Sequence, residues 1–215
     1  MFVCSTFSLC GCHDAIKLLE LFKLCVDVFN DLNLSINVNK CNCCGLDLVV
    51  MSCQTLTLHG NAVQWAEKIT FLGITICQAK VFKCNWDSTK AKFYRSSNAI
   101  IGKLGSSAPA NVILKLVYAQ GVQSLLYGIS ATTLTESELK SFSHAYNSVF
   151  AKTFHSYDNR VISCCQFYSG YLSFNILYDL QRYAFLTKLI KGDHLSEKSA
   201  LDRSDLSDYR HLLMI

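Results

Sequence analysis

The stretch from Asn85 to Tyr127 constrains the fold most, because it predicts two successive helices of different character. On a period of about 3.6 residues, its first part separates an apolar row from a polar row. The apolar row consists of Trp86, Phe93, Ile100 and Leu104, and the polar row of Ser88, Lys92, Arg95, Ser96, Ala99 and Lys103. A turn rich in Gly, Ser and Pro then leads into a more apolar helix.

The polar row of the first helix has two interpretations. Cations set among small polar residues suit contact with an anionic backbone. The alternative is a solvated surface helix, since helices commonly carry a polar outer face. The 215 residues have a formal net charge of +4, which permits nucleic-acid binding without requiring it.

The rest of the C-terminal half also predicts helices. Thr135 with Glu138 three residues later is a capping-box pattern, and the helix that it opens should run to about Phe154. A turn at 157–159, a short segment and Gly170 precede an amphipathic helix over 173–191. The single proline favours long helices over a β-sandwich, and from residue 192 we expect a polar tail.

The first 80 residues predict a β-α-β-β-β layer, so the expected fold class is α+β. Gly73 lies inside the last strand, where a glycine often marks a bulge or a close backbone approach. No run approaches the roughly 18 apolar residues that span a membrane. The expected elements are a strand at 2–8, a helix at 13–32, strands at 34–40 and 46–51, a hairpin around 59–61 and a strand at 69–76.

The 12 cysteines have no regular framework spacing, and we interpret them as mostly reduced thiols of an intracellular protein. The candidate zinc ligands are Cys41, Cys43, Cys44 and Cys53. However, the CxCC spacing lacks the paired CxxC knuckles of common structural zinc sites. The sequence has no GxGxxG, GxxxxGK[ST], HExxH or GxSxG motif. The residues alone therefore predict no catalytic site.

Four segments, in this order and spacing, resemble the reverse transcriptase of non-LTR (LINE-type) retrotransposons. LLELFKLCVDVFNDLNLSINVNKCNCCG (18–45) is similar to motif D, and KITFLGITI (68–76) resembles the primer-grip hairpin, motif E. KFYRSSNAIIGKLG (92–105) with LKLVYAQGVQSLLYG (114–128) looks like the two thumb helices. LKSFSHAYNSVFAKTF, CCQFYSG and LQRYAFLTKL are similar to the helices beyond the thumb.

The resemblance implies a truncated RNA-directed DNA polymerase. Residues 1–80 would be the remnant of an antiparallel palm sheet with one helix, 81–191 a helical thumb-like bundle and 192–215 the tail. In the family, the catalytic Asp-Asp turn directly precedes a strand like MFVCSTFSL, so we expect a chain that starts at Met1 to lack it. The family uses Mg²⁺, but we expect no catalytic residue, metal or cofactor here, and no polymerisation by this chain alone.

The resemblance also assigns binding roles. One lysine would lie near the phosphates of the incoming nucleotide, three residues would hold the primer end, and three cations would face the template-primer duplex through sequence-tolerant contacts. Lys40 would be the lysine near the nucleotide phosphates. Phe71, Leu72 and Gly73 would hold the primer end, and Lys92, Arg95 and Lys103 would face the duplex.

Each of these roles has a plainer alternative. Lys40 would then be an exposed lysine at a strand end, and residues 71–73 an ordinary buried strand. The expected partners are an RNA/DNA template-primer and a separate chain that supplies the missing fingers and palm, with no membrane. Whether the protein is cytoplasmic or nuclear stays open. The competing functions are a helical protein-interaction module and a cysteine-rich zinc module. We also expect self-association through an unpaired strand at 2–8.

Overall fold

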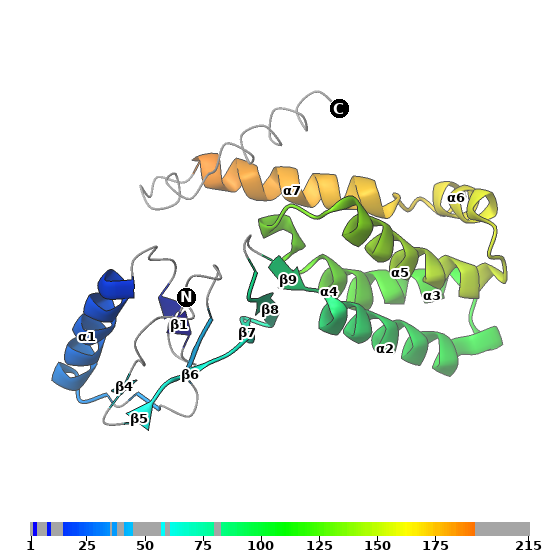
Figure 1. Cartoon of the computed structure of the whole chain (residues 1–215). Coiled ribbons are helices and arrows are strands. Elements are labelled where there is room, and N and C mark those ends of the chain that lie inside the picture. Colours follow the sequence, from blue (N-terminus) through cyan, green and yellow to red (C-terminus); the bar gives the residue numbers. More distant parts are fainter. Residues whose placement is uncertain are drawn as a thin grey trace. The chain divides into compact units, whose positions relative to one another are not determined.

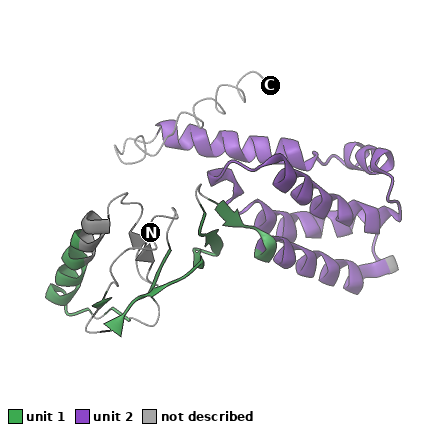
Figure 2. Ribbon diagram, in the orientation of Figure 1, with its two compact units in different colours: residues 1–88 green, residues 89–215 purple. Residues whose placement is uncertain are grey.

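The computed structural model describes residues 2–3, 8–9, 15–34, 36–37, 41–44, 57–58, 61–79 and 83–191 (Figure 1). These residues form a mixed α and β protein with small sheets, as the sequence predicts. The chain divides into two compact units, which comprise residues 1–88 and 89–215 (Figure 2).

The first sheet of unit 1 joins short strands in the order β2-β1-β3-β6. Strand β1 pairs antiparallel with β2 and β3, whereas β3 pairs parallel with β6. A separate antiparallel pair, β4 and β5, forms the hairpin expected around residues 59–61. The predicted helix at 13–32 is confirmed as α1 (Ala15–Asp31). The strands are β1 (Phe2–Val3), β2 (Ser8–Leu9), β3 (Asn42–Cys43), β4 (Thr57–Leu58), β5 (Asn61–Ala62) and β6 (Gln64–Trp65).

Two strand predictions in this unit need correction. The single strand expected at 2–8 is wrong, because β1 and β2 pair with each other and Phe2 lies opposite Leu9. In the segment expected to form a strand at 34–40, the described residues Leu34, Ile36 and Asn37 belong to no strand. The strand expected at 46–51 lies outside the described residues.

The third sheet corrects the prediction of one strand at 69–76. It is an antiparallel meander of β7 (Lys68–Phe71), β8 (Ile74–Cys77) and β9 (Lys83–Asn85). Phe71 pairs with Ile74, which makes Leu72 and Gly73 a two-residue turn. Both turn residues have positive φ, 48° and 81°, as a type I′ hairpin turn requires. Gly73 therefore marks a chain reversal and not a bulge.

Unit 2 is helical and contains the expected helix pair. Helix α2 (Asp87–Leu104) ends in a 3₁₀ turn, η3 (Gly105–Ser107). Pro109 then precedes a helical stretch made of α3 (Ala110–Val117), a π-helical segment η4 (Tyr118–Val122) and α4 (Gln123–Leu126). A further 3₁₀ turn, η5 (Ile129–Ala131), leads to α5 (Glu136–Phe154), α6 (Asn159–Tyr168) and α7 (Phe174–Lys191).

Helix α5 is the central element of unit 2, and it contacts α3, α6 and α7 (Figure 1). Its start is the predicted capping box: the Glu138 backbone N–H donates to the Thr135 hydroxyl, and the Thr135 backbone N–H donates to Glu138. Phe142 of α5 stacks on Phe174 of α7 with ring centroids 5.5 Å apart. The resulting aromatic core fixes the positions of the surfaces described below.

The stretch Ala110–Ala131 is long and apolar enough, by length and composition, to cross a membrane. The sequence alone predicted no such run. However, 44% of an apolar 18-residue part of this stretch is buried inside the protein, and the core helices of soluble proteins can have the same length and composition. Ile113, Leu114 and Val117 are among its buried residues, so we describe it as a core helix.

Candidate nucleic-acid interface

Helix α2 is held on two sides, and this determines which of its faces is open. Phe93 and Ser97 are buried, and the Ser97 hydroxyl donates to the Phe93 carbonyl over 2.8 Å. On the side of α5, the Lys90 ammonium donates to the Ser141 hydroxyl over 3.0 Å. The Lys152 ammonium of α5 donates to the Asn98 side chain over 2.6 Å. These contacts leave the remaining face of α2 directed to solvent.

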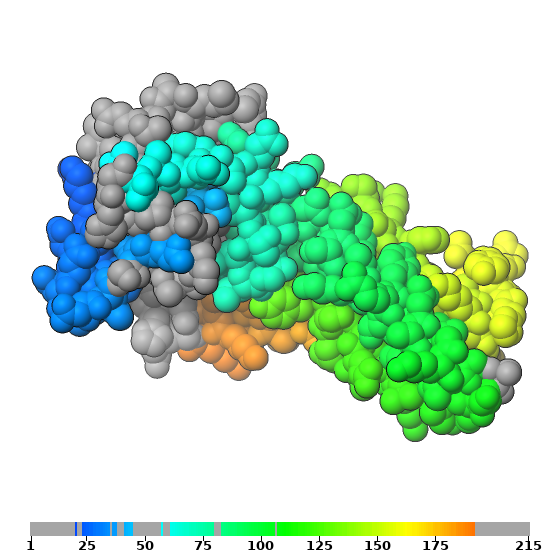
Figure 3. All heavy atoms as spheres, turned by 90° about the horizontal axis from the view of Figure 1, so that it is seen from below, coloured from blue at the N-terminus to red at the C-terminus, as the bar shows by residue number. Residues whose placement is uncertain are grey.

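The open face of α2 carries the three cations that the sequence singled out. Lys92, Arg95 and Lys103 are all exposed. Lys92 and Lys103 are about three turns apart and so lie on the same side of the helix, with Arg95 at the middle of the open face. Within the described residues, none of the three makes an ion pair or a hydrogen bond. Figure 3 views the molecule from the side on which the spheres of α2 reach the surface.

The net positive charge of the chain lies within residues 89–191. Residues 89–191 contain eleven Lys and Arg against four Asp and Glu, a formal net charge of +7, whereas the whole chain has +4. The rest of the sequence therefore sums to −3. A positive potential on one unit attracts polyanions more strongly than the overall charge suggests.

The hairpin between β7 and β8 presents the second group of predicted residues. Phe71 is half-buried, whereas Leu72 at the turn is 70% exposed. Leu72 also has a φ of 48°, a conformation that is rare for a bulky residue and costs about 1–3 kcal/mol. The structure thus places Leu72 and Gly73 at an exposed tip, directly after Phe71 at the end of β7, and the plainer alternative of an ordinary buried strand does not describe these two residues.

The remaining predictions concern the N-terminal unit. Lys40 and Cys53 lie outside the described residues. Cys43 and Cys44 are buried, and burial raises the pKa of the Cys43 thiol to about 11. Within the described part of the chain, no group of three or more His, Cys, Asp and Glu residues is arranged to hold a metal ion. Cys25, Cys77, Cys164 and Cys165 are free thiols.

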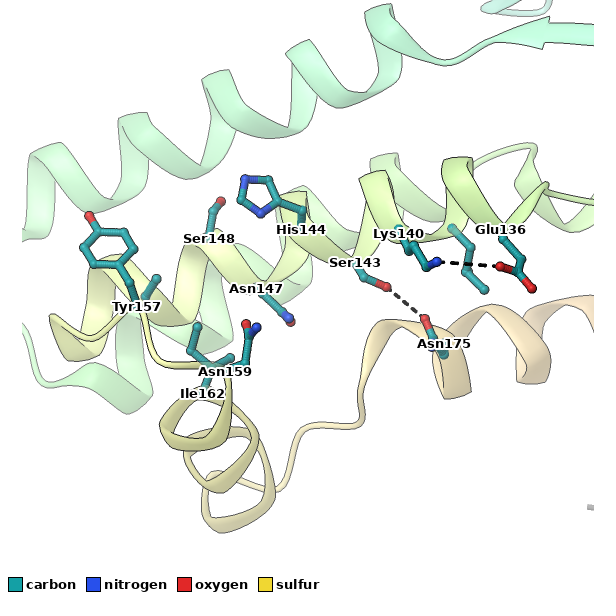
Figure 4. Close-up of a pocket in the computed structure, with 12 residues that line it drawn as sticks. Glu136, Lys140, Ser143, His144, Asn147, Ser148, Tyr157, Asn159, Ile162 and Asn175 are labelled. Carbon is teal, nitrogen blue, oxygen red and sulfur yellow. Dashed lines mark hydrogen bonds and ion pairs between the residues drawn. The ribbon is translucent and has the colours of Figure 1, made fainter.

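A groove that the sequence did not reveal runs along the outer face of α5 (Figure 4). Its volume is about 910 Å³, and α5, the loop before α6, α6 and the start of α7 all contribute side chains. The Ser143 hydroxyl donates to the Asn175 amide oxygen, and the Gln166 amide donates to the Asn147 amide oxygen, each over 2.8 Å. We call this feature the α5 groove. It includes Lys140, Ser143, His144, Asn147, Ser148, Tyr157, Asn159 and Asn175.

Part of the α5 groove had a signal in the sequence. Lys140, His144, Asn147, Ser148 and Ala151 recur at helical spacing and so share one face of the predicted helix. The other groove residues follow only from the packing of α6 and α7 on α5. Comparison of the chain with known protein families, curated proteins and solved structures found no match.

Proposed function

We propose that this protein binds a template-primer duplex as the palm-rear and thumb part of a non-LTR retrotransposon reverse transcriptase. The resemblance of the segments at 18–45, 68–76 and 92–128 to that family supports the assignment. In this proposal, the chain grips nucleic acid and contributes no catalytic residue. Residues 1–80 would correspond to the palm and 81–191 to the thumb and following helices.

The observation that carries the proposal is the open cationic face of α2. Lys92, Arg95 and Lys103 are exposed without protein partners among the described residues, on a unit whose residues 89–191 carry a formal charge of +7. Cations held on a rigid helix neutralise phosphates and release counterions, which gives affinity without sequence preference. A polymerase needs that tolerance, because it must move along any sequence.

The hairpin tip supports the same proposal independently. An exposed leucine in a left-handed conformation costs stability twice, through backbone strain and through apolar exposure. Strained, exposed residues cluster at sites that contact a ligand. In the family that the chain resembles, this hairpin holds the primer end, and we assign that contact to Phe71, Leu72 and Gly73.

The test is the binding of the full chain to a labelled RNA–DNA hybrid, measured by fluorescence anisotropy over a series of salt concentrations. Replacing Lys92 and Arg95 by Glu should weaken binding at low salt by at least about tenfold. The slope of log affinity against log salt should also fall by about two, one for each phosphate that is no longer neutralised.

The matched control carries the same charge reversal elsewhere. Lys188→Glu with Lys191→Glu changes two exposed lysines of α7 and should leave affinity within about threefold. If the wild-type chain has no affinity for the hybrid at low salt, or if both double variants weaken binding equally, the proposal is wrong.

A second function, a helical protein-interaction module, is favoured by the outer face of α7. Ile176 and Leu180 are one turn apart and are 47% and 53% exposed, and Leu172 just before the helix is 44% exposed. Apolar contacts of this kind change little with salt, whereas phosphate contacts weaken steeply. Salt dependence therefore separates the two functions.

A further inference from the structure

We propose that the α5 groove binds a single-stranded nucleic-acid segment, with one base stacked on Tyr157. The proposal rests on the proposed function, because it assigns a second surface of the same protein to the strand that extends beyond the duplex. The cationic face of α2 supplies general attraction to phosphate. The α5 groove has the features that recognise an unpaired strand, namely an aromatic ring, amide donors and an exposed lysine.

The aromatic feature is Tyr157, in the loop between α5 and α6. Its side chain is among the most exposed in the described chain, with 83% of the residue open to solvent. Within the described residues, no group forms a hydrogen bond or a ring contact with it. Figure 4 shows the Tyr157 ring at one end of the groove, the same end at which Ser148 lies. An open ring of this kind is a stacking platform, and every base has a face that fits it.

The amide features have a fixed orientation. The Asn147 oxygen accepts from Gln166, which is 5% exposed, and the Asn175 oxygen accepts from Ser143. Because both oxygens are engaged, each amide has its NH₂ group left as a donor. Donors at fixed positions match the phosphate oxygens and base carbonyls of a nucleic acid.

The formal charges of the groove lining cancel, but its cation is held only weakly by a protein partner. Lys140 and His144 lie one turn apart on α5, and both are exposed. Glu136, the one carboxylate of the lining, is 3.6 Å from the Lys140 ammonium, and both side chains are largely exposed. An exposed pair of this kind is weak, so a phosphate can replace Glu136 as the partner of Lys140. The formal charge of +7 over residues 89–191 adds to the attraction.

The dimensions suit an extended chain better than a compact small molecule. The groove follows α5 from Glu136 to Ala151, a length of about 22 Å at 1.5 Å per residue. An apolar peptide would cover the NH₂ groups of Asn147 and Asn175 without offering them an acceptor, which is costly. An acidic peptide is the remaining competitor, and it would not require the ring of Tyr157.

The experiment compares two probes on the full chain at one low salt concentration. One is a blunt RNA–DNA duplex, and the other carries a single-stranded extension of about six nucleotides. We expect the extension to strengthen binding by about tenfold, the gain of stacking roughly one base. Tyr157→Ala should abolish this gain and leave affinity for the blunt duplex unchanged. Asn175→Asp, which replaces a donor by a carboxylate, should act in the same direction.

Tyr168→Ala is the matched control, since Tyr168 is 85% exposed and lies outside the groove. It should leave the gain intact, and circular dichroism should show that all variants are folded. A wild-type chain that gains nothing from the extension overturns the inference, as does an equal loss in both tyrosine variants. Displacement by polyglutamate as efficient as by unlabelled single strand would assign the groove to acidic peptides. If the chain binds single strands through Tyr157 but does not bind the duplex, the proposed function is refuted and the assignment of the groove stands.

Discussion

Gly121 and Phe93 bring two helices of unit 2 into close contact: a Cβ atom placed on Gly121 would lie 3.3 Å from two carbons of the Phe93 ring. Gly121 belongs to the π-helical segment η4, and Phe93 is a fully buried residue of α2. The same Cβ atom would lie 3.5 Å from the Ser97 hydroxyl oxygen. The absence of a side chain at residue 121 therefore sets the distance between α2 and the π-helical segment.

Two glycine-to-alanine variants should have opposite effects on stability. Gly121→Ala should lower the free energy of unfolding by about 1 kcal/mol, because overpacking against the immobile Phe93 ring outweighs the gain in helix propensity. Gly102→Ala is the matched control: Gly102 is exposed on α2, and nothing lies within 4 Å of the added Cβ. It should stabilise by about 0.5–1 kcal/mol. Urea denaturation measures both values, and equal signs would contradict the expectation.

Arg182 of α7 should be a main contributor to stability. It is 3% exposed, and its guanidinium donates to the Ser130 carbonyl over 2.9 Å and to the Thr133 hydroxyl over 3.1 Å. Arg182→Met should cost about 2–3 kcal/mol, because it leaves these acceptors without their donors. Arg160→Met removes an exposed arginine of α6 and should cost less than about 0.5 kcal/mol. Similar denaturation midpoints for the two variants would show that Arg182 does not hold the 130–133 segment.

The raised pKa of the buried Tyr146 should make the protein less stable at alkaline pH. Burial raises the pKa of its phenol well above the ordinary value of about 10, with smaller contributions from Tyr118 and Tyr171. The folded state therefore keeps a proton that the unfolded state loses above about pH 10, so the free energy of unfolding falls as pH rises beyond that value. The contribution of the protonated Tyr146 phenol to the free energy of unfolding is therefore fully present below about pH 10.

Urea denaturation between about pH 8 and pH 11 tests this expectation. Tyr146→Phe should be less stable at pH 8, since it loses the hydrogen bond from the phenol to the Leu172 carbonyl, and it should show a smaller alkaline decline. Burial also raises the pKa of Tyr94 and Tyr171, so the decline should shrink and not vanish. Parallel pH curves for the two proteins would exclude Tyr146 as a source of the effect.

Local signals explain which elements could be predicted from the sequence. The capping box at Thr135 and Glu138 located α5 to within a residue, because its hydrogen bonds join neighbours in the chain. The residue pattern alone missed the turn at Leu72 and Gly73, because Gly73 was interpreted as a strand glycine and Leu is not the Asn or Asp that usually opens such a turn. The α5 groove was missed because it depends on distant pairs: Ser143 with Asn175, and Asn147 with Gln166, are 32 and 19 residues apart.

The strain at Leu72 predicts a conflict between stability and binding. Asn tolerates positive φ far better than Leu, so Leu72→Asn should raise the free energy of unfolding by about 1 kcal/mol. If the exposed side chain contacts the primer end, the same change should weaken binding of the RNA–DNA hybrid by several-fold. Thr70→Asn, exposed on β7 near the tip, is the control for a nearby polar change and should not stabilise. If the Leu72→Asn variant is more stable and its affinity for the hybrid is unchanged, the hairpin tip does not contact the nucleic acid.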